Sequence, residues 1–284
     1  MTQSPPGAQP APVLVVVGVG GMGRSIARRL GSGKTVLLAD FNDNALSAAA
    51  AELGADGHTV RTQTVDVADA ESVSALAVTA GELGPVVHVA HTAGLSPTQA
   101  PAAAILAVDL VGVALVLEAF GAIIAPGGAG VVIASMAGQT SAPLTAEQEH
   151  QLAVTPAAEL ASLPFVTAEV LADPGQAYGV AKRANQLRVQ AASSVWGARG
   201  ARINSVSPGI ISTPMGQQEL DGPSGVYMRA MIDASGAKRL GTPDDITAAV
   251  AFLLGPDSTF MTGIDLLVDG GVIAALRSGQ VTFS

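Results

Sequence analysis

Cysteine is absent from the 284 residues of this sequence. The absence excludes disulfides, thiolate chemistry and zinc sites with cysteine ligands. Positive charge is also scarce, because 14 lysines and arginines face 23 aspartates and glutamates and leave a net charge of -9. An acidic chain without a basic run is not expected to bind nucleic acid or an anionic membrane surface. The four histidines are scattered and lie away from clustered carboxylates, so no metal site is predicted.

A long uninterrupted apolar run is missing too. The nearest candidate covers residues 102–125, but Asp109, Glu118 and two glycines interrupt it, and a membrane span needs about 20 mostly apolar residues. We expect a buried helix there. Residues 1–12 lack the basic and apolar regions of a signal peptide and are rich in Pro, Gln and Ser, which predicts a disordered tail on a cytoplasmic protein.

Hydrophobic residues make up 49% of the chain, which suits one domain over residues 13–284 with a large core. Strands are predicted over residues 13–17, 35–39, 59–65, 86–90, 130–134, 201–206 and 264–268. Helices are predicted over residues 24–30, 45–53, 71–82, 102–124, 178–196 and 244–254. This alternation favours a Rossmann-type α/β fold, a doubly wound parallel sheet with helices on both faces and a ligand crevice at the carboxyl ends of the strands.

Two segments interrupt the alternation. Residues 140–175 contain four prolines and scattered apolar residues, which predicts an inserted segment of short helices and turns. We expect it to pack around the substrate mouth or against the following helix. Residues 213–238 contain several glycines and two prolines and are expected to form an irregular, mobile substrate lid.

A glycine-rich turn lies between the first predicted strand and the first helix. It reads Gly18-Val19-Gly20-Gly21-Met22-Gly23, the Gly-x-Gly-x-x-Gly pattern of dinucleotide-binding proteins. Its glycines allow a tight turn and a close approach to a pyrophosphate, and the helix N-terminus offers free N–H groups to the phosphates. Asp40 ends the second strand, where a carboxylate can hold the adenosine ribose hydroxyls. The alternative is an ordinary glycine turn with a chance aspartate.

A tyrosine and a lysine lie four positions apart, at Tyr178 and Lys182. On a helix this spacing puts both side chains on one face. A nearby ammonium stabilises a phenolate and lowers the pKa of the phenol, so Tyr178 is a candidate general acid/base. By itself the spacing is more typical of an amphipathic surface helix, but Ser135 also ends a predicted strand at the same sheet edge.

These features resemble the short-chain dehydrogenase/reductase family over nearly the whole chain. The matching motifs are the glycine turn, Asp66-Val67, Ala93-Gly94, Ser135-Met136-Ala137-Gly138, Tyr178 with Lys182, Asn204-Ser205-Val206-Ser207-Pro208-Gly209 and Val268-Asp269-Gly270-Gly271. The connection after Gly94, the segment before Tyr178 and the tail after Gly271 resemble, within the family, the bacterial 3α-hydroxysteroid dehydrogenase/carbonyl reductase group.

The resemblance implies hydride transfer between a nicotinamide and a carbonyl or alcohol. It implies that Tyr178 moves the proton, that Lys182 also binds the nicotinamide ribose, and that Ser135 holds the substrate oxygen. The cofactor contacts it implies are Gly18, Gly20, Gly21, Met22, Gly23, Asp40, Phe41, Asp66, Val67, Thr92, Ala93, Gly94, Tyr178, Lys182, Pro208, Gly209, Ile211 and Thr213.

The sequence departs from the family pattern at three places. The glycine turn is one residue shorter than usual, and His91-Thr92-Ala93-Gly94 stands where the family has Asn-Asn-Ala-Gly. Asp109 takes the place of a mid-helix asparagine that helps carry a water to the lysine. Its charge would partly oppose the effect of Lys182 on Tyr178. Asp109 and the shorter glycine turn motivate an alternative function, a catalytically weak nucleotide-binding or interaction protein on the same fold. A sugar epimerase fits less well.

The leading expectation is an NAD(H)-dependent oxidoreductase that prefers NAD(H) over NADP(H), because Asp40 would repel a 2′-phosphate. The expected substrate is a small apolar secondary alcohol or ketone, such as a steroid or terpenoid. A homodimer through the last helix and strand 264–268 is expected, with a tetramer as the alternative. His88 lies in an apolar strand and is expected to be a core residue, whereas His91 fits a structural or a catalytic role.

Overall fold

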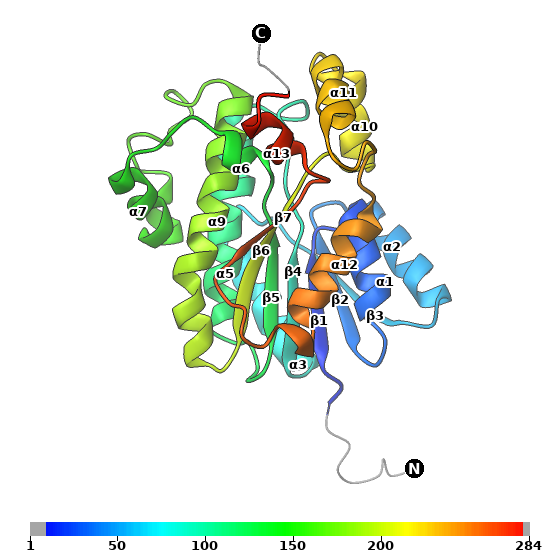
Figure 1. The fold of residues 1–284 in the computed structure, drawn as a ribbon. Helices are drawn as coiled ribbons and strands as arrows, with labels where there is room; N and C mark the ends of the chain where they lie inside the picture. The colour runs from blue at the N-terminus through cyan, green and yellow to red at the C-terminus, as the bar shows by residue number, and fades with distance from the viewer. Residues whose placement is uncertain (1–9, 281–284) are drawn as a thin grey trace, which may run out of the picture.

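The computed structural model describes residues 10–280 (Figure 1). Most of the predicted tail, residues 1–9, and the end of the predicted domain, residues 281–284, lie outside this range. The described residues form one sheet of seven parallel strands in the order β3-β2-β1-β4-β5-β6-β7. The strands are β1 (Val13–Val17), β2 (Thr35–Asp40), β3 (Thr59–Thr64), β4 (Val86–His91), β5 (Ala129–Ile133), β6 (Arg202–Pro208) and β7 (Asp265–Val268). The predicted doubly wound parallel sheet is confirmed.

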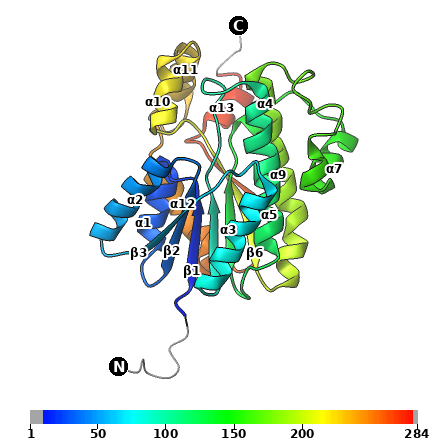
Figure 2. The same cartoon turned by 180° about the vertical axis from the view of Figure 1, so that it is seen from behind.

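Helices cover both faces of the sheet. One face carries α1 (Gly21–Leu30), α2 (Asp43–Ala55) and α12 (Pro243–Leu254), seen in front in Figure 1. The other carries α3 (Ala70–Leu83), α5 (Val113–Gly121) and α9 (Pro174–Ala198), seen in front in Figure 2. β1 is fully buried between the two layers, which explains its continuous apolar sequence.

The strand order reverses between β1 and β4, and parallel α/β folds bind ligands at such a switch point, outside the carboxyl ends of the strands. The glycine turn follows β1, Thr92 follows β4, and Ser135 follows β5 within two residues. Most of the predicted site residues therefore lie at one edge of the sheet.

The apolar run that begins at residue 102 is a helix in the protein core. It is divided into α4 (Ala102–Ile105), a π-helix (Leu106–Gly112) and α5. It is the one stretch of residues 10–280 that is long and apolar enough to cross a membrane. Buried residues of all three parts pack against the sheet or against α9, as in the core helix of a soluble protein.

The segment over residues 140–175 contains the end of α6 (Ala137–Thr140), then α7 (Ala146–Val154) and α8 (Ala157–Leu160). Its buried Leu152 and Leu160 share an apolar cluster with residues of α4 and α9. Arg188 of α9 also donates to the carbonyls of Leu152 and Thr155 at 3.0 and 2.7 Å. The segment is thus fixed to the helix that carries Tyr178.

Residues 213–238 are not irregular, and that part of the prediction is wrong. They form α10 (Pro214–Asp221) and α11 (Gly225–Ala234), separated by a short turn that begins at Gly222. The Thr213 hydroxyl caps α10 by accepting from the Gly216 N–H at 3.1 Å. A further short helix, α13 (Val272–Arg277), was not predicted; the Asp269 carboxylate accepts N–H bonds that fix its start.

Candidate active site

The glycine turn is packed tightly against the end of β4. Gly18 has φ +94°, and a Cβ there would lie 2.5 Å from the Ala93 amide nitrogen. A Cβ on Gly23 would lie 1.9 Å from the Gly18 carbonyl oxygen. The Thr92 hydroxyl donates to that same oxygen at 2.7 Å. Gly18 is therefore required by the close approach of the turn to the residues that follow β4, and Gly23 by its contact with the Gly18 carbonyl.

The other side of the turn is open. A Cβ on Gly20 would meet no described atom within 4 Å, and Gly20 is exposed where α1 begins. The first-turn N–H groups of a helix have no intrahelical acceptor, and the described first turn of α1 contains no acidic side chain. This open, electropositive end fits the pyrophosphate of a dinucleotide. Gly20, Gly21 and Met22 would hold it, with Thr213 packed against Gly21.

The Asp40 carboxylate is held at the end of β2 beside the glycine turn. It accepts from the Val19 N–H at 2.8 Å and from the Asn42 N–H at 2.9 Å. Each carboxylate oxygen can accept a second hydrogen bond, so the group fits the adenosine ribose hydroxyls. Phe41 is 76% exposed next to it and could cover an adenine ring.

Lys182 and Asp109 form a buried ion pair behind Tyr178. The Lys182 Nζ lies 2.9 Å from Oδ2 of Asp109 and 5.3 Å from the centroid of the Tyr178 ring. Oδ1 of Asp109 accepts from the Leu95 N–H at 2.8 Å, and both charged side chains are almost completely buried. Gly94 leaves room for the pair, since a Cβ on it would lie 2.9 Å from Oδ2 of Asp109. Asp109 is thus a direct partner of the lysine.

The sequence predicts that Lys182 lowers the pKa of Tyr178, and its charge acts in that direction, but burial outweighs it and the pKa of Tyr178 lies above its ordinary value. Burial of the phenol raises its pKa; the Lys182 charge opposes that effect, and the Asp109 charge adds to it. Burial acts to lower the pKa of Lys182, but Asp109 and Tyr178 raise it above its ordinary value. At pH 7 a neutral phenol therefore lies beside an ammonium.

Ser135 lies within reach of Tyr178. Its side chain acts to lower the pKa of the Tyr178 hydroxyl, and its Oγ accepts from the Ala137 N–H at 3.1 Å. The Met136 N–H donates to the Pro208 carbonyl at 2.9 Å, which ties the loop after β5 to the end of β6. Ser135, Tyr178 and Lys182 are therefore brought together as the sequence predicts.

Two histidines of β4 differ in their surroundings. His88 is half-buried, and burial lowers its pKa to about 4. His91 is buried near Lys182, and burial together with that charge lowers its pKa to about 3. Both imidazoles are neutral at pH 7, so His91 adds no positive charge near Lys182. Within residues 10–280 no cluster of three or more histidines and acidic residues could hold a metal ion.

The remaining predicted cofactor contacts lie along the same sheet edge. Asp66 is exposed after β3 and Val67 is buried against Gly112. Pro208 ends β6 and Gly209 follows it, and Ile211 bridges to Gly241 before Thr213. These roles remain predictions about bound cofactor.

Sequence reasoning missed Glu219 of α10. Its carboxylate is near enough to Tyr178 to raise the pKa of the phenol, and the buried Ser96 side chain acts to lower the pKa of Glu219 itself. Burial raises the pKa of Glu219. No local signal could have identified it, because it reaches the site only through the packing of α10 over the loop after β4, where Gln99 donates to Gln218 at 3.1 Å.

Similarity to known proteins agrees with this geometry. The family description "short chain dehydrogenase" matches residues 12–147, and "Enoyl-(Acyl carrier protein) reductase" matches residues 140–273. The short-chain dehydrogenase/reductase bsc3 of Alternaria brassicicola is 43% identical over 264 residues, 93% of this chain and 96% of that protein. The chain belongs to the short-chain dehydrogenase/reductase family. As such it is an oxidoreductase that acts on alcohols or ketones with a nicotinamide cofactor.

Other short-chain dehydrogenases extend the comparison. D-threitol dehydrogenase of Mycolicibacterium smegmatis is 30% identical over 91% of both chains. The 3-alpha-hydroxysteroid dehydrogenase/carbonyl reductase of Comamonas testosteroni is 28% identical over 66% of this chain and 73% of that protein. A short-chain type dehydrogenase/reductase from Mycobacterium ulcerans shares the fold, with a TM-score of 0.73 and 23% identity over 94% of this chain and 90% of that one. The predicted narrower resemblance thus has a relative, at lower identity than the first two.

The Asp109 charge leads to a prediction for this short-chain dehydrogenase. With Tyr178 as the predicted general base, alcohol oxidation needs its phenolate, and Asp109 raises the pKa of the phenol. Asp109→Asn keeps an oxygen for the Leu95 N–H but removes the charge. We expect the rising limb of kcat/KM for oxidation to move to lower pH in the variant. A pH–rate profile of both proteins measures this, and a limb that stays or moves to higher pH would contradict it.

Proposed function

We propose that this enzyme transfers a hydride between NAD(H) and an apolar secondary alcohol or its ketone. The observation that carries the proposal is the surroundings of Tyr178: the Lys182 ammonium lies 5.3 Å from its ring centroid, and the Ser135 side chain is near enough to act on the pKa of its hydroxyl. A phenol, a cation and a hydroxyl donor at one sheet edge form an acid/base constellation. The open side of the glycine turn at Gly20 is further evidence for a dinucleotide cofactor.

The chain's own residues account for the proton. A nicotinamide dinucleotide, when bound, supplies or accepts the hydride. In ketone reduction, the Ser135 hydroxyl hydrogen-bonds the substrate oxygen and Tyr178 gives its proton to that oxygen. In alcohol oxidation, the Tyr178 phenolate takes the hydroxyl proton. Lys182 stabilises the phenolate, and Asp109 keeps Lys182 charged and in place.

An apolar substrate is supported by apolar clusters packed against Met136, the residue after Ser135, and against Leu95. Met136 packs against a buried cluster built from α10, α11, α13 and the segment after β6. Its members include Leu220, Met228 and Met231, and methionine side chains adapt to irregular apolar shapes. On the other side, Leu95 packs against the cluster that contains α4 and α9.

A hydroxylated substrate is the second candidate. Glu219 brings a carboxylate near enough to Tyr178 to act on its pKa, and this carboxylate could bind a second substrate hydroxyl. D-threitol dehydrogenase, a polyol enzyme by its name, is among the similar proteins. Assays with steroids, terpenols and simple secondary alcohols beside polyols, each with NAD+ and NADP+, distinguish the two candidates. Turnover of polyols alone would reject the apolar substrate.

The proposed preference for NAD(H) rests on Asp40. A 2′-phosphate would place a like charge beside its carboxylate, at a penalty of about 2–3 kcal/mol, or roughly 30- to 150-fold in affinity. We expect NADH to bind roughly 30- to 150-fold more tightly than NADPH. In Asp40→Ala the difference in affinity between the two cofactors should become smaller. Fluorescence titration with both reduced cofactors measures it. NADPH binding as tightly as NADH would reject the preference.

We also propose a homodimer through β7 and α12. β7 is a half-exposed edge strand, and the neighbouring Phe252, Met261 and Ile264 are 41%, 38% and 36% exposed. Unpaired strand edges and apolar patches favour association. Sedimentation should give a dimer, and Ile264→Lys should shift it toward monomer. A structure with two α9 helices packed side by side would contradict this interface.

A cytoplasmic location stays a prediction from the sequence.

A further inference from the structure

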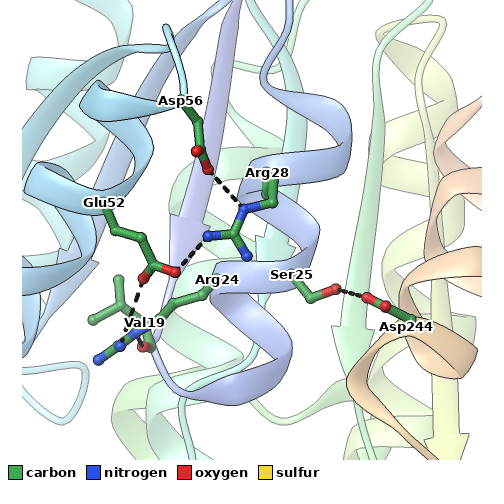
Figure 3. Close-up of polar contacts among 7 residues, drawn as sticks. All are labelled: Val19, Arg24, Ser25, Arg28, Glu52, Asp56 and Asp244. Atoms are coloured by element: carbon green, nitrogen blue, oxygen red, sulfur yellow. Dashed lines mark hydrogen bonds and ion pairs between the residues drawn. The ribbon is translucent and has the colours of Figure 1, made fainter.

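Arg24 lies against the glycine turn, and its position suggests a role that the motif pattern does not assign to it. Its Nε donates to the Val19 carbonyl at 2.8 Å (Figure 3). The N–H of the same Val19 donates to the Asp40 carboxylate at 2.8 Å. Val19 therefore donates its N–H to Asp40 and accepts from the Arg24 side chain with its carbonyl oxygen. The guanidinium lies next to the position where Asp40 is expected to meet the adenosine ribose.

An acidic side chain of α2 holds this arginine. The Arg24 Nη1 lies 3.9 Å from Oε2 of Glu52, and the other Glu52 oxygen accepts from Nη2 of Arg28 (Figure 3). Nε of Arg28 donates to Asp56 at 2.9 Å. Arg24 and Arg28 of α1 thus both contact Glu52 of α2. Arg28 also contacts Asp56, the residue that caps the C-terminal end of α2.

The charges of this network matter for cofactor choice. In dinucleotide-binding folds an arginine near the ribose accommodates a 2′-phosphate, whereas an acidic residue at the strand end selects the free hydroxyl. This chain carries both, Asp40 at the strand end and Arg24 at the turn. Arg24 is paired with the Glu52 carboxylate and with the Val19 carbonyl. These contacts make its positive charge less available to a 2′-phosphate.

We propose that Glu52 is a specificity-determining residue: by neutralising and holding Arg24, it adds to the discrimination of Asp40 against NADP(H). The inference rests on the proposed preference for NAD(H). Arg24 and Glu52 are 37% and 46% exposed at their side chains, so their pairing is weak and reversible. A freed Arg24 can therefore turn toward a 2′-phosphate without unfolding the turn.

The test is Glu52→Gln, with NADPH and NADH titrated by fluorescence against the wild type. We expect NADPH to bind about three- to fivefold more tightly and NADH to change less than about twofold, the size of an exposed ion pair. Asp56→Asn is the matched control, because it removes the same charge from the network at Arg28 rather than at Arg24. Its NADPH affinity should change less than half as much.

Arg24→Ala completes the cycle. In the double variant Arg24→Ala/Glu52→Gln the gain for NADPH should vanish, because the cation that binds the phosphate is gone. A gain that persists in the double variant, an equal gain in Asp56→Asn, or no gain in Glu52→Gln would each overturn the inference. These outcomes are separate from failure of the proposed NAD(H) preference, which appears in the wild type alone as NADPH binding at least as tightly as NADH.

Discussion

Replacing Tyr178 with Phe should lower turnover by about 100- to 10,000-fold, the contribution typical of a positioned general acid/base. The change removes only the hydroxyl whose pKa the neighbouring Ser135 side chain acts on. The ring stays beside Lys182 and the apolar contacts of α9 remain, so the fold and NADH binding should be nearly unchanged. Steady-state assays on an identified substrate, with NADH titration of the same preparation, measure both quantities.

Ser141→Ala is a suitable control for Tyr178→Phe. Ser141 lies beside Gly179, and its hydroxyl donates to the Gly138 carbonyl at 3.4 Å. Its turnover should stay within about threefold of the wild type, as expected of a substitution outside the acid/base contacts. If Tyr178→Phe kept a similar rate, Tyr178 would not be the acid/base.

Replacing Lys182 with Met should damage both activity and stability. Its ammonium is the partner of the buried Asp109 carboxylate at 2.9 Å, and it donates to the Ile133 carbonyl at 3.4 Å. Removing one member of a buried pair leaves an uncompensated charge and costs about 3–5 kcal/mol of unfolding free energy. The phenolate also loses its cation, so turnover should fall by at least about 100-fold. Urea unfolding and steady-state kinetics test the two effects.

The double variant Lys182→Met/Asp109→Asn separates these effects. It removes both charges, and the introduced asparagine side chain would still offer an oxygen to the Leu95 N–H. Unfolding free energy should recover by most of the loss, while turnover should stay low because the phenol still lacks its cation. Recovery of both would show that Lys182 acts only as a structural residue.

The local parts of the site were predictable from the sequence. Tyr178 and Lys182 share a face because helix geometry fixes the spacing, and Asp40 and Ser135 follow apolar strands whose ends meet at one edge. The sheet itself follows from the alternation of strand and helix patterns. Helices α10 and α11 were missed because their glycines and prolines suggest turns, although here most of these residues sit at or near helix ends.

The energetics of the site depended on tertiary packing. The pKa of Tyr178 rises because burial disfavours the charged phenolate. The spacing of residues in the sequence does not show how far a side chain is buried. The contact of Asp109 with Lys182 requires the π-helical stretch to lie against α9. The pairing of Arg24 with Glu52 similarly requires α1 and α2 to pack side by side.

The most direct test of the central claim follows the hydride itself. Purified protein is given NADH that carries deuterium on the transferable position, together with the ketone that is turned over most rapidly, and the product is examined by mass spectrometry. We predict one deuterium on the carbinol carbon of the product alcohol in the wild type, and at least about 100-fold less labelled alcohol in the same time from Tyr178→Phe. An unlabelled, isomerised product, or NADH binding with no labelled alcohol from any ketone tested, would contradict the assignment as an oxidoreductase.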